Sequence, residues 1–404
     1  MPVTAEAEEL GLDGRRLERI GDWMARYVEA GKLAGALTLV ARHGEIAYLD
    51  GRGLRDREAG AAVTEDTVFR IYSMTKPITS VAAMMLFEEG CFQLGDPLAR
   101  YLPEFADMRV WTGGKGAAMK TEPAHRPICI HDLFVHMSGL TYDFFDDTPI
   151  DALYREQGIS LPGSTEPLAT VIERLAGLPL LSQPGAEWNY SVATDVLGRL
   201  VEVWSGQTLD RFFAERIFAP LGMTETGFVV PAGRLDRFAA LYGLKDGALD
   251  LLEAPARSRF ALEGRALSGG GGLCGTIGDY FRFAEMLRGK GAFDGGRLLS
   301  PKTVEYMTRN HLDGDLAANG QSVFSETSYD GIGFGLGFSV VLDPAKAKVM
   351  ASVGEYAWGG AASTVFWNDP EEDVTVIFMT QLLPSSTWPL RPELRALVYQ
   401  ALDD

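Results

Sequence analysis

The chain has 404 residues, of which 46% are hydrophobic and 23% are charged, proportions typical of a globular protein. They exclude a collagen-like chain, a small disulfide-stabilised scaffold and a mainly disordered chain. The formal net charge is −18 without long runs of one sign, and such a surface repels nucleic acid and anionic membranes, so we expect neither as a partner.

The N-terminal segment has neither a basic start nor an apolar stretch, so we expect no signal peptide. Nowhere does the chain approach the roughly 20 consecutive apolar residues that cross a bilayer. Its three cysteines, Cys91, Cys129 and Cys274, are an odd number at spacings that match no zinc motif. They predict reduced thiols and a cytoplasmic protein, and no base close in sequence supports a cysteine nucleophile.

The first predicted elements are an amphipathic helix over residues 10–31 and a two-stranded hairpin around Arg42, His43 and Gly44. Helical spacing follows in the middle of the chain, and segments rich in Gly, Pro and Asp between the helices predict loops. The helices are expected over residues 73–90, 168–177, 191–205 and 207–219, and the loops over residues 103–128 and 141–166.

The C-terminal part predicts strands at residues 334–343, 348–354, 362–368 and 374–381, and then a helix from Pro392 to Leu402. Short connections between these strands indicate an antiparallel sheet. The predicted fold is α/β of the α+β kind, an antiparallel sheet flanked by helices with an inserted mainly helical domain. Residues 1–70 and 265–404 form the sheet-and-helix domain, residues 71–264 form the helical domain, and the cleft between them is the expected active site.

Ser73 and Lys76 lie at the start of the helix predicted over residues 73–90. Residues three apart lie on one side of a helix, so we expect the hydroxyl and the amine to be neighbours. An amine whose pKa is lowered by burial can take the proton of a serine hydroxyl, and a helix N-terminus favours a developing oxyanion. The alternative is a helix-capping Ser73 and a solvated Lys76, because Ser-x-x-Lys alone is a weak motif.

Further motifs accompany this pair. Tyr190 precedes a predicted helix, where its phenol can relay a proton, and Trp358-Gly359-Gly360 begins a predicted strand. In this order, together with the segments at residues 130–142 and 218–228, the motifs resemble the serine β-lactamase and penicillin-binding-protein superfamily over about residues 15–385. The resemblance is greatest to its esterase branch, the family VIII carboxylesterases similar to class C β-lactamases.

The resemblance implies that Ser73 is the nucleophile, and that Lys76 and Tyr190 act jointly as general base and later as acid for the leaving group. It implies an oxyanion hole made by the backbone N–H groups of Ser73 and Ala361. It also implies catalysis without a cofactor or a metal, and a β-lactamase/transpeptidase-like fold, which agrees with the element order above.

Two departures from the β-lactamase motifs favour esters. Tyr190-Ser191-Val192 lacks the Asn that holds a β-lactam side-chain amide, and Trp358-Gly359-Gly360 replaces a Lys-Thr-Gly whose cation pairs with a carboxylate. An aromatic wall in place of a charge favours neutral acyl esters. We therefore expect the substrate to contact the Trp-Gly-Gly segment together with Tyr142 and Phe144. The aromatic residues Tyr142, Phe144, Phe145, Tyr356 and Trp388 either wall an acyl pocket or belong to the core.

Other features have simpler interpretations. His131 and His136 are five apart and do not share a helix face, so structural histidines are favoured over a metal pair or a catalytic base. Gly269–Gly272 is not followed by the Gly-Lys-Ser/Thr of a phosphate-binding loop, so a tight turn that lines the cleft is favoured. The chain contains no Gly-x-Ser-x-Gly, which excludes the nucleophile elbow of α/β-hydrolases.

The favoured hypothesis is a serine hydrolase that cleaves short-chain carboxylic esters through an acyl-enzyme on Ser73. A β-lactamase, a D-amino-acid peptidase or an acyltransferase is an alternative on the same fold, because only the leaving group or the second nucleophile differs. A non-catalytic binding protein is a further alternative, since a fold alone does not determine function.

Overall fold

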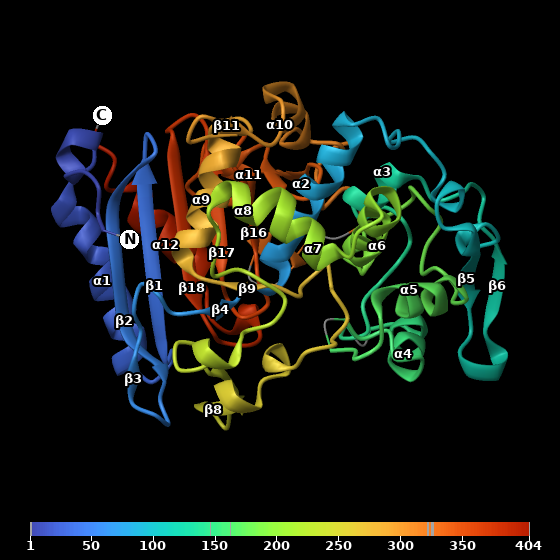
Figure 1. Ribbon diagram of the computed structural model, residues 1–404, viewed down its shortest axis with the longest axis horizontal. Helices are drawn as coiled ribbons and strands as arrows, with labels where there is room; N and C mark the ends of the chain where they lie inside the picture. The colour runs from blue at the N-terminus through green and yellow to red at the C-terminus, as the bar shows by residue number, and fades with distance from the viewer. Residues whose placement is uncertain (1, 146, 162, 321–322, 325–326, 404) are drawn as a thin grey trace.

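The computed structural model describes residues 2–145, 147–161, 163–320, 323–324 and 327–403. Its centre is an eight-stranded antiparallel sheet with the strand order β14-β15-β16-β17-β18-β1-β2-β3 (Figure 1). These strands are β1 (Gly35–Arg42), β2 (Glu45–Asp56), β3 (Ala61–Ala62), β14 (Ile332–Phe334), β15 (Ser339–Val341), β16 (Tyr356–Gly359), β17 (Val365–Asp369) and β18 (Val374–Thr380). Ala36 pairs with Thr380 and Arg42 with Val374, so the N-terminal hairpin joins the C-terminal strands in one sheet. The predicted fold class is confirmed.

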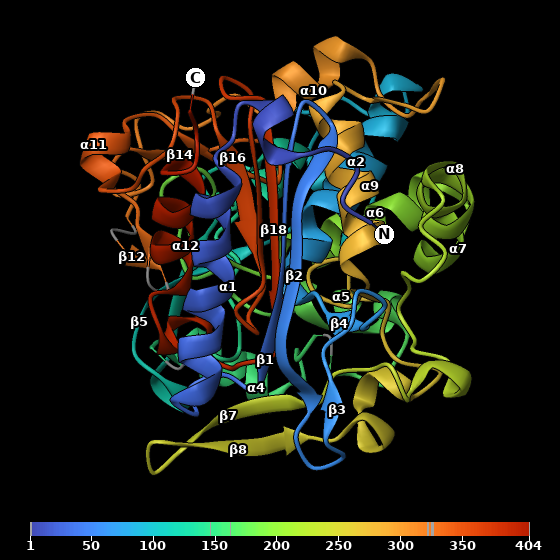
Figure 2. The ribbon, with the colours of Figure 1, turned by 90° about the vertical axis from the view of Figure 1, so that its left-hand side faces the viewer.

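Helices cover both faces of this sheet. α1 (Gly14–Glu29) and α12 (Leu390–Tyr399) lie side by side on one face, as Figure 2 shows, and α9 (Ile277–Arg288) and α2 (Thr75–Glu88) lie on the other. Every residue of β1, β17 and β18 is buried. Burial on both faces explains why these strands are nearly continuous apolar runs instead of alternating sequences.

The rest of the described chain forms further helices and pairs of strands around this layered centre. The helices are α3 (Ile130–Phe134), α4 (Pro149–Glu156), α5 (Leu168–Ala176), α6 (Ala193–Ser205), α7 (Leu209–Phe213), α8 (Ala219–Leu221), α10 (Pro301–Met307) and α11 (Pro344–Ala347). The strand pairs are β4 (Phe69–Arg70) with β9 (Cys274–Gly275), β5 (Arg109–Gly113) with β6 (Lys120–Pro123), β7 (Leu241–Lys245) with β8 (Ala248–Glu253), β10 (Ala292–Phe293) with β11 (Gly296–Arg297), and β12 (Val323–Phe324) with β13 (Thr327–Ser328). The division into two domains at residues 70 and 264 stays a prediction.

Several predicted elements differ from the structure. The helix predicted over residues 10–31 begins only at Gly14, and residues 348–354 form no strand. The loops predicted over residues 103–128 and 141–166 contain β5, β6 and α4, and residues 146 and 162 lie outside the described residues. α4 forms because Pro149 and a Thr148–Asp151 capping box start a helix despite the loop-like composition. The helix predicted over residues 207–219 is divided by a π-helical turn, Ala214–Phe218.

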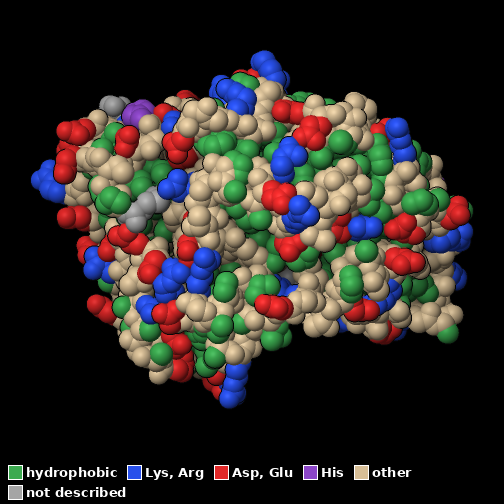
Figure 3. All heavy atoms as spheres, in the orientation of Figure 1, with side chains coloured by type: hydrophobic (Ala, Val, Ile, Leu, Met, Phe, Trp, Pro, Cys, Tyr) green, Lys and Arg blue, Asp and Glu red, His purple; other side chains and the backbone are tan. Residues whose placement is uncertain are grey.

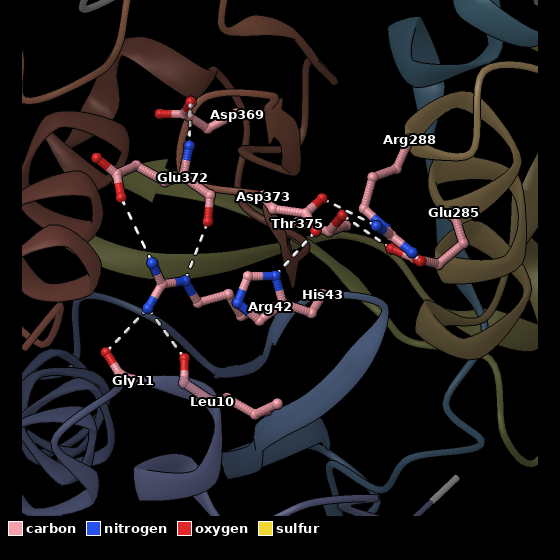
Figure 4. Close-up of polar contacts among 10 residues, drawn as sticks. All are labelled: Leu10, Gly11, Arg42, His43, Glu285, Arg288, Asp369, Glu372, Asp373 and Thr375. Carbon is pink, nitrogen blue, oxygen red and sulfur yellow. Dashed lines mark hydrogen bonds and ion pairs between the residues drawn. The ribbon is translucent and has the colours of Figure 1, made fainter. Parts of the chain in front are cut away.

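Polar contacts fix the turn end of the sheet. Arg42 donates to the carbonyl of Gly11 (3.0 Å), and the carboxylate of Asp373 pairs with His43 and with Arg288 of α9 at 2.9 Å each (Figure 4). These contacts tie the N-terminal segment, two strand turns and α9 together. On the face in Figure 3, acidic and basic side chains are interspersed, as the sequence predicts. Among the described residues, no helix is both long and apolar enough to cross a membrane.

Candidate active site

Ser73 lies in a 3-10 turn, Tyr72–Met74, that leads directly into α2, so it precedes this helix and is not part of its first α-helical turn. Tyr72 has a φ of 42°, in the left-handed region that costs a non-glycine residue on the order of 1–3 kcal/mol. The neighbouring residues are held in place, since the Ile71 N–H donates to the Leu273 carbonyl at 3.1 Å. The sharp turn leaves the Ser73 side chain half-buried, within reach of a ligand.

Lys76 is buried against Ser73. Its Nζ lies 3.2 Å from Ser73 Oγ and donates to the carbonyl of Gly270 at 2.6 Å, and the residue is 1% exposed. Burial lowers the pKa of Lys76 to about 7, although the negative charge of Asp195 raises it in part. The alternative of a solvated lysine is therefore wrong, and a substantial fraction of this amine is neutral near pH 7.

Tyr190 reaches the same point from the segment that precedes α6. A hydrogen bond links it to Ser73, the indole Nε1 of Trp358 donates to its phenol oxygen at 3.3 Å, and Lys76 Nζ lies 4.6 Å from its ring centroid. Burial raises the pKa of Tyr190, and the hydrogen bonds with Ser73 and Trp358 oppose this rise. The phenol is therefore neutral at pH 7. The structure thus brings together the three side chains that the sequence motifs single out.

The glycine-rich turn packs directly on these helices. Gly270 accepts from Lys76 through its carbonyl and donates through its N–H to Asp195 Oδ1 at 3.0 Å, and the carbonyl of Gly269 accepts from Thr79 at 2.7 Å. A Cβ at Gly270 would lie 2.5 Å from Asp195 Oδ2, so only glycine fits. The backbone of this turn therefore lines the candidate site, as expected.

Asp195 is a buried carboxylate that the sequence analysis missed. It is 1% exposed, its Oδ1 accepts from Ser268 at 2.5 Å, and burial raises its pKa while the charge of Lys76 lowers it. It lies five residues after Tyr190, on α6. An acidic residue five positions after Tyr190 was the one available signal in the sequence, but the hydrogen-bond partners of Asp195 are more than 70 residues away along the chain.

The end of β16 passes close to the turn that carries Ser73. A Cβ at Gly360 would lie 2.5 Å from the Ile71 carbonyl, so this approach requires glycine. Ala361 follows as an exposed residue, and among the described residues no group accepts a hydrogen bond from its N–H. Its N–H is therefore available to a ligand near Ser73.

Aromatic rings surround Tyr190. Tyr142 stacks on Phe144 with ring centroids 4.6 Å apart, and the Tyr142 ring lies 5.3 Å from that of Tyr190. The ring centroids of Phe144 and Phe145 are 5.0 Å apart, and Phe144 is 59% exposed. Tyr142, Phe144 and Phe145 thus form one cluster beside the site.

Two aromatic residues of the predicted pocket lie elsewhere. Tyr356 accepts from Asn368 (2.9 Å) inside the core, and Trp388 donates to the Lys32 carbonyl (3.2 Å) near α1. Tyr356 lies beside α9, because the Asn368 amide that donates to its hydroxyl also donates to the Ala284 carbonyl of α9 (2.9 Å). Trp388 packs with the residues of α1 and α12, on the opposite face of the sheet.

The histidines make structural contacts. His136 is 1% exposed, contacts Ser191 at 3.2 Å and packs on Tyr190, whereas His131 contacts His311 at 3.2 Å. Burial, and secondarily the charge of Lys76, lowers the pKa of His136 well below its usual value. His136 therefore acts as a neutral packing residue. In the described part of the chain, no three His, Cys, Asp or Glu side chains gather as a set of metal ligands.

The fold and this constellation define a β-lactamase-type protein. A family model described as Beta-lactamase matches residues 20–400, and the chain belongs to this family. The chain is 38% identical to Protein Rv1367c of Mycobacterium tuberculosis, covering 93% of this chain and 91% of that protein. It is 34% identical to Esterase EstB of Burkholderia gladioli, covering 91% of each. Among solved structures, "EstCE1, a hydrolase with promiscuous acyltransferase activity" superposes with a TM-score of 0.81 at 27% identity, over 96% of this chain and 99% of that one.

Proposed function

We propose that this protein is a serine esterase that cleaves short-chain carboxylic esters through an acyl-enzyme on Ser73. The contact between Lys76 Nζ and Ser73 Oγ, 3.2 Å long, carries the proposal because burial lowers the pKa of this lysine to about 7. An amine with this pKa is a general base at neutral pH. The similarity to an esterase and to a hydrolase with acyltransferase activity supports the same chemistry.

In the first step, Ser73 Oγ attacks the ester carbonyl carbon while neutral Lys76 takes the hydroxyl proton. The amine can accept this proton while its own N–H still donates to the Gly270 carbonyl at 2.6 Å. Tyr190 remains a neutral phenol, so it relays a proton and does not replace Lys76 as the base. The N–H groups of Ser73 and Ala361 hold the developing oxyanion.

In the second step, the tetrahedral intermediate expels the alcohol, whose oxygen receives the proton held by Lys76 through the Tyr190 phenol. The acyl group then remains on Ser73 Oγ. Water attacks the acyl carbonyl while Lys76 again takes a proton, and that proton returns to Ser73 Oγ as the carboxylic acid leaves. No cofactor enters this sequence of steps.

The residues around the site support an ester in preference to a β-lactam. Val192, at the position of the β-lactamase Asn, is fully buried, and Trp358 directs its indole N–H to Tyr190. Trp358, Gly359, Gly360, Tyr142 and Phe144 are the proposed substrate contacts. Transfer of the acyl group to an alcohol instead of water is the second candidate, supported by the activity named for EstCE1. Action in the cytoplasm is likewise a proposal, resting on the odd number of cysteines.

Covalent labelling tests the proposed nucleophile. We expect a fluorophosphonate to add one phosphonyl group to the intact protein and peptide mapping to place it on Ser73, because a serine activated by Lys76 attacks phosphorus as it attacks an ester carbon. Hydrolysis of p-nitrophenyl butyrate should be lost in proportion to labelling. A label on another serine, or hydrolysis that persists in fully labelled protein, would contradict the proposal.

The pH dependence should follow the amine of Lys76. Only the neutral amine accepts a proton, so kcat/KM should rise with pH through about 7, the pKa of Lys76. The negative charge of Asp195 raises that pKa, so Asp195→Asn should move the rise in kcat/KM to lower pH. Both pH profiles of kcat/KM can be measured between pH 5 and 9 by titration of the released carboxylic acid.

The matched control for this shift is Asp279→Asn, which alters another buried carboxyl. Asp279 lies on α9, and its carboxylate accepts a hydrogen bond from the Thr226 hydroxyl at 2.8 Å. It is not among the charges that shift the pKa of Lys76. The midpoint of the rise should stay in place in this variant. A rise that does not move in Asp195→Asn, or that moves to higher pH, would count against Lys76 as the base.

A further inference from the structure

Arg391, in the first turn of α12, contacts the backbone behind the proposed oxyanion hole. Its Nη2 donates to the Gly360 carbonyl at 3.1 Å and to the Thr364 carbonyl at 3.2 Å. The Gly360 carbonyl belongs to the same peptide group as the Ala361 N–H. In a trans peptide the C=O and the N–H point in opposite directions, so a donor on this oxygen lies behind the N–H that faces the substrate.

We infer that Arg391 is a positioning residue for the oxyanion hole. This inference rests on the proposed function. Its guanidinium fixes the plane of the Gly360–Ala361 peptide and, through a charge-assisted hydrogen bond, draws electron density toward the Gly360 oxygen. The Ala361 N–H becomes a better donor, because hydrogen bonds at the two ends of one amide polarise each other. Negative charge appears on the substrate oxygen only in the transition state, so this effect acts on kcat more than on KM.

The two glycines of the Trp-Gly-Gly segment leave the space that Arg391 needs to reach the Gly360 carbonyl. A Cβ at Gly359 would lie 2.4 Å from Arg391 Nη2, so the guanidinium occupies the space that any side chain there would fill. A Cβ at Gly360 would lie 2.3 Å from Thr364 Oγ1 and 2.5 Å from the Ile71 carbonyl. Gly359 therefore allows Arg391 to approach the backbone from the α12 side. Gly360 allows the close approach of the turn that carries Ser73.

The same face of α12 also holds the other end of β16. Arg395 and Tyr399 follow Arg391 at intervals of four residues, and both bind Glu355, which directly precedes β16. The Tyr399 hydroxyl contacts Glu355 at 2.8 Å and Asp369 of β17 at 2.7 Å. Helix docking and oxyanion positioning are therefore separable, because Tyr399 affects the first and Arg391 affects both.

Arg391→Ala, Arg391→Lys and Tyr399→Phe test the inference in the full chain. We expect Arg391→Ala to lower kcat for p-nitrophenyl butyrate by about 10- to 100-fold with KM within about twofold, and Arg391→Lys to lower kcat less. Inhibition by phenylboronic acid, which forms a tetrahedral oxyanion adduct on serine, should weaken by the same factor as kcat falls. Millimolar methylguanidinium should restore part of the kcat of Arg391→Ala and none in Ser73→Ala.

Tyr399→Phe is the matched control, and we expect it to lower the melting temperature while kcat stays within about twofold. Three results would overturn the inference: an unchanged kcat in Arg391→Ala, a loss confined to KM, or an equal loss of kcat in Tyr399→Phe. If the alanine variant does not fold, Arg391→Lys still decides the test. An Arg391→Lys protein whose kcat, KM and boronic acid affinity equal those of the wild type would also refute the inference. Failure of a fluorophosphonate to label Ser73 in the wild-type protein would remove the proposed function and the inference together. Normal labelling and unaffected Arg391 variants would remove the inference alone.

Discussion

Replacing Ser73 with alanine lowers kcat for p-nitrophenyl butyrate by about 10⁴-fold or more, the effect expected when a covalent nucleophile is lost. The hydroxyl is the atom that forms the acyl-enzyme, and Lys76 and Tyr190 act on the ester only through it. Steady-state kinetics with the purified variant measures this loss. Because Ser73 is half-buried in a turn and the change removes a single oxygen atom, the melting temperature of Ser73→Ala should remain close to that of the wild-type protein.

Ser80→Ala is the matched control for this prediction. Ser80 lies on α2 one turn after Lys76, is 1% exposed and has no place in the proposed chemistry. We expect its kcat to stay within a few-fold of wild type. Retained turnover in Ser73→Ala, above the trace that wild-type contamination explains, would rule out an acyl-enzyme on this residue.

Lys76→Met is expected to lower kcat by about 10³-fold or more while it makes the protein more stable. The loss of activity follows from removal of the general base. The gain in stability follows from burial, because a pKa lowered from 10.5 to about 7 means that folding penalises the charged amine by about 4 kcal/mol at pH 7. Methionine leaves the Gly270 carbonyl without its donor, which costs about 1–3 kcal/mol. The free energy of unfolding should therefore rise by about 1–3 kcal/mol.

The pH dependence of this gain has a definite sign. Between pH 7 and 10.5 the unfolded wild-type chain holds a proton on Lys76 that the folded protein has lost, so wild-type stability rises with pH in this window. The advantage of Lys76→Met should consequently be greatest near pH 7 and below, and should shrink toward pH 10. Urea unfolding of both proteins at pH 6, 8 and 10 measures the difference.

Lys302→Met provides the reference for these unfolding measurements. The Lys302 side chain is 87% exposed and pairs with Glu305 at the surface, so its loss should change stability little at any pH. A Lys76→Met protein that is less stable than wild type at pH 6, or a difference that does not vary with pH, would mean that the lysine is not forced toward its neutral form by burial.

The order of the main elements was predictable because their signals are local. The strands around Arg42 and the apolar runs at residues 362–368 and 374–381 have strand composition on their own, and they form β1, β2, β17 and β18. The strand expected at residues 348–354 was wrong because Lys348, with a φ of 58°, ends α11 and leads into a loop. Polar segments such as β5 and β6 were missed because backbone pairing, not hydrophobic alternation, defines them.

The amino-acid sequence alone determined that Ser73 and Lys76 would be neighbours, since a separation of three residues brings two side chains together on a helix and also from the 3-10 turn that leads into α2. Tertiary structure alone decided that Lys76 is buried against Gly270, that Asp195 lies beneath this glycine turn, and that Arg391 stands behind Gly360. Each of these contacts joins segments 31 to 194 residues apart, so it depends on how helices and sheet pack. The amine's pKa follows from that packing, because removing water from a charged group is a property of the whole enclosure and not of any short motif.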